Sequence, residues 1–269
     1  MSKPLSGRTA LVTGSTSGIG LAIAITLAEA GARIGLNGLG TAEQIKDATD
    51  KLKAAGAPEV RYFNANLMDA AAIDAMMTEA LGWGSGVDIL VNNAGMQFTA
   101  SVANMPVEKW QAIINLNLSA CFYTMRHALP AMAARGYGRV INIASVHGLV
   151  ASIEKAPYVA SKFGLVGLTK VAALEYAAAG DRASGGVTVN AICPGWVETP
   201  LIEPQIQARA EKFGGDRAQG YKNLVLEKEP SGRMADPSDI GALALFLCSK
   251  AAHNITGTAM PVDGGWTAQ

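Results

Sequence analysis

The chain of 269 residues has little cysteine and no surplus of charge. Its three cysteines, Cys121, Cys193 and Cys248, lack the spacing of a metal site or a disulfide framework, so we expect no metal and a reduced, cytoplasmic setting. Lysine plus arginine equals aspartate plus glutamate at 22 each, which leaves no basic excess to bind nucleic acid. No uncharged apolar run is long enough for a membrane span, and the polar start MSKPLSGR does not resemble a signal peptide. The sequence therefore argues against nucleic-acid-binding, membrane and disulfide-rich secreted classes.

Apolar residues make up 49% of the chain, and their spacing alternates between strand and helix patterns. The expected strands are the short apolar runs 8–13, 33–37, 59–64, 87–91, 139–143, 187–192 and 259–262. The expected helices are 18–30, 42–54, 69–81, 106–134 and 157–179. Repeated β-then-α units predict one α/β domain over 1–269, a Rossmann-like, doubly wound parallel sheet of about seven strands with helices on both faces. The charge-rich segment 201–232 interrupts the alternation, and we interpret it as a helical flap over the ligand cleft.

A glycine-rich turn, TGSTSGIG, follows the first expected strand. Gly14 ends the strand, and Gly18 and Gly20 open a helix whose N-terminal N–H groups suit a pyrophosphate. Glycine is needed where a Cβ would block the approach of the ligand to the backbone. Three glycines alone are also compatible with an ordinary tight turn, but their place after the first strand of a parallel sheet favours dinucleotide binding.

The end of the second expected strand bears on the choice of dinucleotide. An acid there would bind the ribose 2′-hydroxyl of NAD, and an arginine would favour NADP. The segment 37–40 reads Asn-Gly-Leu-Gly and has neither residue. Because no cation is there to neutralise a 2′-phosphate, we predict NAD as the cofactor.

Tyr158 and Lys162 stand four residues apart on an expected helix, so they share one face. An ammonium beside a phenol favours the phenolate and suits the phenol to proton transfer. Ser145 follows the fifth strand, at the sheet edge where such folds bind ligands, and its hydroxyl can steady a substrate oxygen. Without the glycine-rich turn, the same spacing would describe an ordinary helix face. With it, the pattern indicates a hydride-transfer enzyme.

These elements resemble those of the short-chain dehydrogenase/reductase family, in the same order along the chain. The motifs that carry the resemblance are Thr13-Gly14-x-x-x-Gly18-Ile19-Gly20, Asn92-Asn93-Ala94-Gly95, Asn117, Ser145, Tyr158, Lys162 and Pro194-Gly195. The resemblance implies that Tyr158 is the general acid/base, that Lys162 binds the nicotinamide ribose, that Ser145 orients the carbonyl and that Asn117 holds a water. It implies a cofactor-binding set of Gly14, Thr16, Ser17, Gly18, Ile19, Gly20, Asn66, Leu67, Asn93, Gly95, Tyr158, Lys162, Pro194, Gly195, Val197 and Thr199. Asn66 departs from the family, which usually has Asp there to bind the adenine amine.

The expected substrate is a small carboxylic acid. Gln97, His147, Lys155 and Gln205 map near Tyr158 and offer one cation and several hydrogen-bond donors. Trp196 and Trp266 are expected to wall the pocket. The segments NNAGMQ, SVHGLVAS, EKAPY, ICPGWVETPL and VDGGWTA resemble the subfamily of bacterial D-3-hydroxybutyrate dehydrogenases. That resemblance implies that Gln97, Ser145, His147, Lys155, Tyr158 and Gln205 surround a hydroxy acid, and that the reaction is reversible oxidation of (R)-3-hydroxybutyrate to acetoacetate with NAD.

Other interpretations stay open at this stage. Each substrate-site residue alone could be an ordinary loop or surface residue, and Trp266 could serve a subunit interface. The same scaffold could reduce 3-oxoacyl thioesters or oxidise sugar alcohols, in which case Lys155 and His147 would be idle. A dinucleotide-sensing module without catalysis is a third reading, against which the full catalytic set argues. Family resemblance further implies a homotetramer in which the helices 106–134 and 157–179 pair between subunits.

Overall fold

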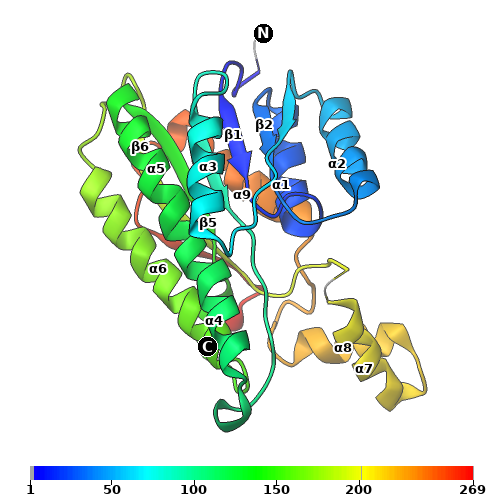
Figure 1. Ribbon diagram of the computed structural model, residues 1–269. Helices are drawn as coiled ribbons and strands as arrows, with labels where there is room; N and C mark the ends of the chain where they lie inside the picture. The colour runs from blue at the N-terminus through cyan, green and yellow to red at the C-terminus, as the bar shows by residue number, and fades with distance from the viewer. Residues whose placement is uncertain (1–2, 201, 269) are drawn as a thin grey trace.

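The structure, a computed structural model, describes residues 3–200 and 202–268. Its centre is a seven-stranded sheet in which every pair of neighbouring strands is parallel, in the order β3-β2-β1-β4-β5-β6-β7 (Figure 1). The strands are β1 (Thr9–Val12), β2 (Arg33–Leu36), β3 (Val60–Tyr62), β4 (Ile89–Asn92), β5 (Tyr137–Ile143), β6 (Gly186–Pro194) and β7 (Ala259–Val262). This is the doubly wound parallel sheet that the alternating pattern predicts.

The strands are apolar throughout because both faces of the sheet are covered by helices. In β1, Ala10 and Val12 point into one core cluster and Leu11 into the other, as the two-residue period of a strand requires. In β4, Ile89 and Leu90 divide in the same way. A continuous apolar run therefore supplies side chains to two cores.

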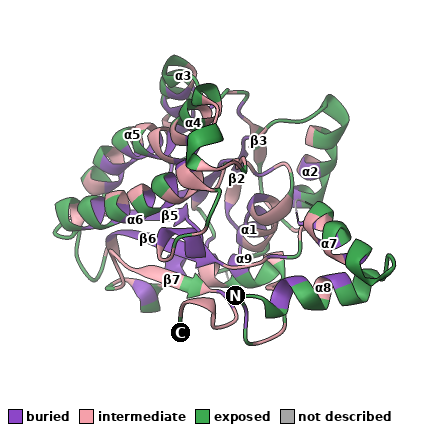
Figure 2. Ribbon diagram, turned by 90° about the horizontal axis from the view of Figure 1, so that it is seen from below, coloured by how far each residue is buried: buried purple, intermediate pink, exposed green. Residues whose placement is uncertain are grey.

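Helices form a layer on each face, and two short helices stand outside these layers (Figures 1 and 2). The helices are α1 (Gly18–Glu29), α2 (Ala42–Ala54), α3 (Ala70–Leu81), α4 (Val107–Ile114), α5 (Ala120–Arg135), α6 (Ala156–Tyr176), α7 (Glu203–Ala210), α8 (Arg217–Leu226) and α9 (Pro237–Cys248). Helices α1, α2 and α9 contribute to one core cluster, and α3, α5 and α6 to the other. In the described parts of the chain, no helix combines the length and the apolarity that crossing a bilayer would require.

Two helices differ from the sequence-based expectation. The helix expected over 106–134 is interrupted, because Asn115–Ser119 forms a π-helical turn between α4 and α5. Such turns change the direction of side chains without ending the helix, so apolar periodicity does not reveal them. Helix α9 was not predicted at all, although Asp236 and Asp239 form a capping box around Pro237 at its first turn.

The strand order places the ligand site. The chain winds outward from β1 through β2 to β3, and then returns to β4 on the other side of β1. Loops after β1 and β4 therefore leave the sheet in opposite directions, and the crevice between them is where such sheets bind ligands. The carboxyl ends of β5 and β6 bring further loops to the same edge.

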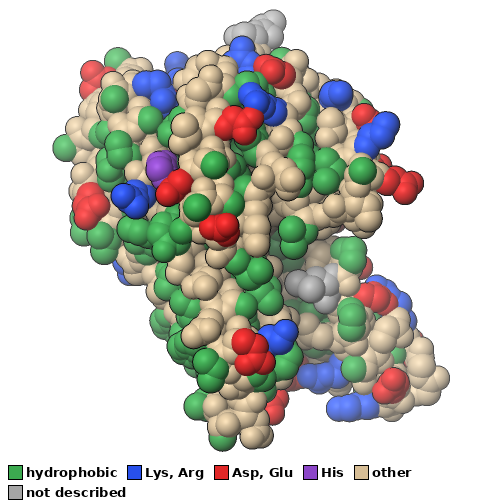
Figure 3. Space-filling view, in the orientation of Figure 1, with side chains coloured by type: hydrophobic (Ala, Val, Ile, Leu, Met, Phe, Trp, Pro, Cys, Tyr) green, Lys and Arg blue, Asp and Glu red, His purple; other side chains and the backbone are tan. Residues whose placement is uncertain are grey.

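Beyond this edge lies the segment that we expected as a helical flap, here α7 and α8 joined by a short 3-10 turn, Glu211–Phe213. Residue 201, the first of the expected range, lies outside the described part of the chain. The space-filling view shows a recess between these helices and the rest of the molecule (Figure 3). Ile202, Ile206 and Leu224 form a small apolar cluster inside the flap, and Trp196 packs against it.

Candidate active site

The turn after β1 has the backbone that its glycines allow. Gly14 and Gly18 adopt φ of +62° and +54°, in the left-handed region that disfavours other residues. Gly20 is required for a different reason, because a Cβ there would lie 2.3 Å from the Gly14 carbonyl oxygen. These constraints come from the turn itself, and the approach of a ligand to its backbone stays a prediction.

The N-terminus of α1 can accept an anion. Ser17 is its N-cap, yet its side chain makes no capping hydrogen bond, and the first turn contains no acidic residue. A Cβ on Gly18 would meet only the Thr199 methyl group, at 3.9 Å, so the loop after β6 faces this turn across an opening. Ile19 packs against the core behind it. Free N–H groups and the helix dipole in front of an opening fit the pyrophosphate of a dinucleotide.

Thr13 and Asn93 join the ends of β1 and β4. The Thr13 hydroxyl donates to Val91 O and accepts from the backbone N–H groups of Asn93 and Ala94. The Asn93 amide donates to the carbonyl oxygens of Thr13 and Gly14, at 3.0 Å each. Asn93 therefore holds the glycine turn itself, in addition to its expected place along the cofactor channel.

On the adenosine side, the loop after β2 is fixed by polar contacts. The Asn37 amide donates to Phe63 O and Ala65 O, and the Thr16 hydroxyl donates to Leu39 O at 2.8 Å. Leu39 is 84% exposed, and no cationic side chain stands in the segment 37–40. This loop offers a 2′-phosphate no charge-assisted partner.

The other adenine-side residues are Asn66 and Leu67. Asn66 is exposed, and its side-chain oxygen already accepts the Met68 N–H at 3.1 Å, a local turn that a sequence pattern does not disclose. Leu67 is buried in the second core cluster. The amide of Asn66 thus still has its NH₂ group and one lone pair free for a ligand.

Residues 194–199 leave the end of β6. Pro194 pairs with Val262 of β7, and the Gly195 N–H donates to Val262 O at 2.9 Å. Val197 is buried and forms an isolated bridge with Ala235. The loop is therefore fixed on both sides while Thr199 faces the glycine turn.

Asn117 lies in the π-helical turn and is completely buried. Its side chain exchanges two hydrogen bonds with the main chain of Met96, and its Nδ2 donates to the Ser161 hydroxyl at 3.3 Å. A Cβ on Gly95 would lie 3.3 Å from its Oδ1. The π turn places this amide between the loop after β4 and α6.

Ser145, Tyr158 and Lys162 meet at the carboxyl end of β5. Ser145 caps the 3-10 turn that follows the strand and accepts the His147 N–H. Lys162 is buried, its Nζ donates to Ile143 O at 2.7 Å, and it lies 5.6 Å from the centre of the Tyr158 ring. An ammonium with two donors left beside a half-exposed phenol is a suitable proton-transfer pair.

A second cation, Lys155, lies beside His147, whose ring contacts Tyr158. The Lys155 ammonium donates to His147 Nε2 at 3.4 Å and sits 5.5 Å from the Trp196 ring. The His147 ring makes edge contacts with Tyr158 and Trp266, at 6.0 and 5.4 Å between centroids, and the two indoles pack at 5.5 Å. We call these five residues, Tyr158, His147, Lys155, Trp196 and Trp266, the aromatic cluster.

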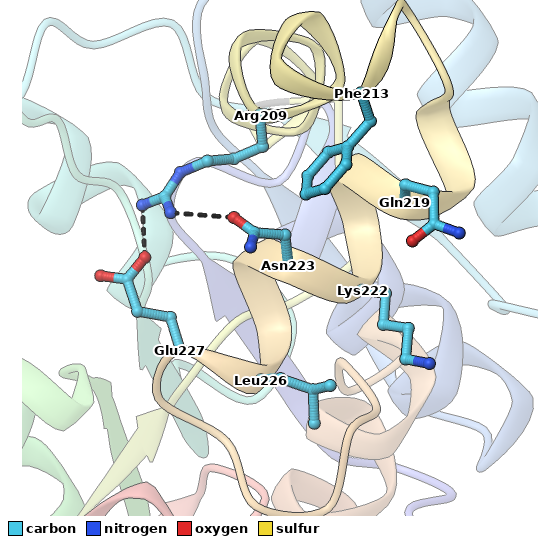
Figure 4. A pocket seen from close by; sticks show the side chains of 7 residues that line it. All are labelled: Arg209, Phe213, Gln219, Lys222, Asn223, Leu226 and Glu227. Carbon is cyan, nitrogen blue, oxygen red and sulfur yellow. Dashed lines mark hydrogen bonds and ion pairs between the residues drawn. The ribbon is translucent and has the colours of Figure 1, made fainter.

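The two expected glutamines are not part of this cluster. Among the described residues, the side chains of Gln97 and Gln205 make no hydrogen bond, so the structure does not join them to Lys155. Gln205 lies in the first turn of α7, within the flap. A cavity of about 440 Å³ also lies in the flap, lined by Arg209, Phe213, Gln219, Lys222, Asn223, Leu226 and Glu227. None of the proposed catalytic residues lines it, and its Arg209–Glu227 ion pair stays within the flap (Figure 4).

His147 is held neutral. Burial, followed by the positive charge of Lys155, lowers the pKa of His147 from 6.5 to about 4. Its Nδ1–H donates to Val150 O at 3.2 Å, which leaves Nε2 as the acceptor of the Lys155 ammonium. Val150 was not predicted as a site residue, and no sequence signal marks a carbonyl that fixes a tautomer.

This shift predicts a pH-dependent loss of stability. The unfolded chain binds a proton at His147 below about pH 6.5, whereas the folded protein resists it down to about pH 4. Stability should therefore fall as pH drops through this window, by about 2 kcal/mol between pH 7 and pH 5. Urea unfolding at both pH values should show a smaller loss for His147→Gln than for the parent. His253→Gln, outside this cluster, is the control, and equal losses in all three proteins would contradict the prediction.

Ser161 is another residue that the sequence reasoning missed. Its hydroxyl donates to Tyr158 O at 2.7 Å and accepts from Asn117, so it links two proposed catalytic residues. Its place between Tyr158 and Lys162 on one helix was the available signal, because a serine three residues along can bond back to the backbone. Thr13 was likewise noted only as part of the glycine motif, although its hydroxyl joins the ends of β1 and β4.

Comparisons with known proteins show the family to which this chain belongs. The family model described as enoyl-(acyl carrier protein) reductase matches residues 14–267. The D-beta-hydroxybutyrate dehydrogenase of Cupriavidus necator is 51% identical, over 98% of this chain and 100% of the relative, and that of Rhizobium meliloti is 47% identical, over 97% and 99%. The structure of L-sorbose reductase from Gluconobacter frateurii, complexed with NADPH and L-sorbose, superposes with a TM-score of 0.91 at 31% identity and covers 100% of both chains. From its motifs, its sheet and these relatives, the chain belongs to the short-chain dehydrogenase/reductase family.

Proposed function

We propose that this protein oxidises (R)-3-hydroxybutyrate to acetoacetate, reversibly, with NAD. The observation that carries the proposal is the place of Lys155, a half-buried ammonium within the same cluster as the Tyr158 phenol. Among residues 3–200 and 202–268, Lys155 forms no ion pair, so its charge is available to an anionic ligand. The names of the two D-beta-hydroxybutyrate dehydrogenases support the same substrate.

In the proposed mechanism, Lys155 binds the substrate carboxylate and the tryptophan pair limits the length of the acid. His147 stays neutral and fixes the Lys155 ammonium through Nε2. Ser145 then hydrogen-bonds the C3 hydroxyl, and Tyr158 accepts its proton as the general base. NAD, when bound, would supply the acceptor for the C3 hydride. The chain holds the dinucleotide through the glycine turn, Lys162 and the loop 194–199, and positioning of the alcohol supplies much of the rate.

The proposal is tested with purified protein, NAD and each enantiomer of 3-hydroxybutyrate, followed by the absorbance of the reduced cofactor. Only the R enantiomer should be oxidised, and its methyl ester should be a much poorer substrate because it lacks the anion. Equal activity on the ester and the acid would instead favour a 3-oxoacyl thioester reductase or a sugar-alcohol dehydrogenase. Binding of NADH with no turnover of any acid or ester would favour a dinucleotide-sensing module.

Among the nicotinamide cofactors that the family uses, we expect NAD to be preferred over NADP by about 100-fold in kcat/KM, the value of one or two missing charge-assisted hydrogen bonds. The exposed Leu39 stands where a cation would be needed. Leu39→Arg should reduce the preference about tenfold, and Leu39→Gln serves as the uncharged control. A parent protein that prefers NADP would contradict this prediction. The measurement is needed because a structural relative, L-sorbose reductase, was solved with NADPH.

We also propose a homotetramer. Large apolar side chains are exposed on α5 and α6, namely Phe122, Phe163, Val171 and Leu174. Two long helices with exposed large apolar residues favour pairing with a second copy. Light scattering of the purified protein gives the assembly mass directly.

The cytoplasm is the proposed location. All three cysteines are described, buried and free, and burial raises the pKa values of Cys121 and Cys193 to about 11 and of Cys248 to about 12. Such thiols are poor nucleophiles and oxidise slowly. They support a protein that works without disulfides.

A further inference from the structure

One buried acid has no role in the mechanism above. Glu229 lies just after α8, is 1% exposed, and accepts the Trp196 N–H through Oε1 at 2.6 Å. Its second oxygen, Oε2, has no hydrogen-bond partner among the described residues. A buried carboxyl with half of its hydrogen-bonding capacity unused destabilises the fold unless another interaction compensates for it.

Glu229 lies where three segments meet. The loop after β6 approaches so closely that a Cβ on Gly195 would lie 2.2 Å from Oε1. The turn after β7 is equally close, since a Cβ on Gly264 would lie 3.2 Å from Oε2, and the Ser231 N–H donates to Gly264 O. The Glu229 N–H donates to Val225 O, which joins it to the end of α8. The carboxyl thus fills the joint between the flap, the Trp196 loop and the C-terminal turn.

Both walls of the aromatic cluster depend on this joint. Trp196 follows Gly195 directly, and Trp266 follows the Gly264–Gly265 turn. Asp263 fixes the other side of that turn by accepting from Gly265 N–H and from Thr267. No other described side chain bonds the main-chain N–H of Trp196, whose carbonyl oxygen accepts the Ala235 N–H, so Glu229 holds one side of the residue that packs against Trp266 and Lys155.

We infer that Glu229 is a positioning residue that holds Trp196 and Trp266 where they enclose the acid-binding pocket. The inference rests on the proposed function, because the pocket is that of the hydroxy acid. Glu229 acts through the main chain of Trp196 and does not touch the substrate. Replacing it should therefore weaken binding of the acid more than it slows proton transfer.

Glutamine is the conservative replacement for Glu229, because it resembles the neutral form of the carboxyl. Burial, with a smaller effect of the nearby Asp263 charge, raises the pKa of Glu229 to about 7. A large fraction of the carboxyl is therefore neutral at working pH. A glutamine keeps the acceptor for the Trp196 N–H and the shape of the neutral acid.

The experiment compares Glu229→Gln, Glu229→Asp and Glu229→Leu. Leucine removes the acceptor, and aspartate shortens the reach by one methylene, so that a variant remains if leucine prevents folding. KM and kcat are measured for (R)-3-hydroxybutyrate, KM for NAD, and circular dichroism for the coupling of the indole pair. Thr258→Val is the control, since it removes a buried hydroxyl that has no hydrogen-bond partner among the described residues and lies just before β7, at the other end of that strand from the turn that Glu229 contacts.

Leucine and aspartate should raise KM for the acid by about tenfold, the size expected when one buried donor loses its partner, with kcat and KM for NAD within about twofold. They should also weaken the indole coupling, whereas glutamine and Thr258→Val should leave both readouts unchanged. Unchanged KM and unchanged coupling in folded leucine and aspartate variants would overturn the inference. A parent protein inactive on the acid would reject the proposed substrate, and the circular dichroism would then decide the role of Glu229 independently.

Discussion

Tyr158→Phe should lower kcat for 3-hydroxybutyrate by about 10³-fold, the usual contribution of a general acid/base, while NADH still binds. The change removes one hydroxyl and nothing else from the side chain. The phenol faces the cluster of His147 on one side and the Lys162 ammonium on the other. Among the described residues, the neighbouring side chains are poor bases here: burial, followed by the charge of Lys155, lowers the pKa of His147 to about 4, its Nε2 already accepts the Lys155 ammonium, and the Ser145 hydroxyl is a weak base.

The control for this variant lies on the same helix. Tyr176 ends α6, and its hydroxyl makes no hydrogen bond among the described residues, so Tyr176→Phe should retain full activity. Steady-state kinetics give kcat, and the fluorescence of bound NADH gives the dissociation constant. If Tyr158→Phe retained more than about a tenth of kcat, the role of the phenol as general base would have to be abandoned.

The architecture was predictable because local pattern and global fold agree. Buried strands such as β4 read as continuous apolar runs, and the glycines of the first turn have no substitute on steric grounds. The two misjudged helices show the limit. The π turn at Asn115–Ser119 differs from a regular helix by one hydrogen-bond step, and α9 followed a charge-rich segment that masked its capping box.

The site was predictable to the extent that its residues are close in sequence. Ser145, His147, Lys155, Tyr158 and Lys162 belong to one stretch, and the structure places them at one sheet edge. Gln97 and Gln205 come from distant segments, and among the described residues neither side chain hydrogen-bonds to this stretch. Glu229 stands in the run Glu-Lys-Glu-Pro, which looks like a solvated surface, and only tertiary packing shows that it is buried.

Lys155 is held in place by its backbone. Glu154, just before it, adopts a left-handed φ of +61°, and its carbonyl oxygen accepts the Ala100 N–H. Lys155 then begins α6 as its N-cap, with the side chain turned back toward His147 and Trp196. Burial lowers the pKa of the Lys155 ammonium. The charged form of Lys155 is therefore destabilised in the free protein, where no described anion lies beside it. A substrate carboxylate would supply the missing partner.

Lys155→Ala should therefore raise KM for (R)-3-hydroxybutyrate by about 100-fold, as expected when one member of a buried charge pair is removed. It should also reduce kcat, since a carboxylate without its anchor leaves the C3 hydroxyl poorly aligned with Tyr158 in the transition state. KM for NAD should be unchanged, and the poor activity on the methyl ester should change little, because the ester never used the ammonium.

Lys109→Ala provides the matched control, because Lys109 also lies over an aromatic ring, that of Phe98, but outside the cluster. Initial rates for acid and ester in the three proteins separate loss of charge recognition from general damage. If Lys155→Ala kept the parental KM for the acid, Lys155 would not bind the substrate carboxylate, and the protein would be a dehydrogenase of another alcohol. Loss of acid activity with the ester rate unchanged would tie the choice of substrate to one ammonium, and the hydride-transfer chemistry to the separate set of Ser145, Tyr158 and Lys162.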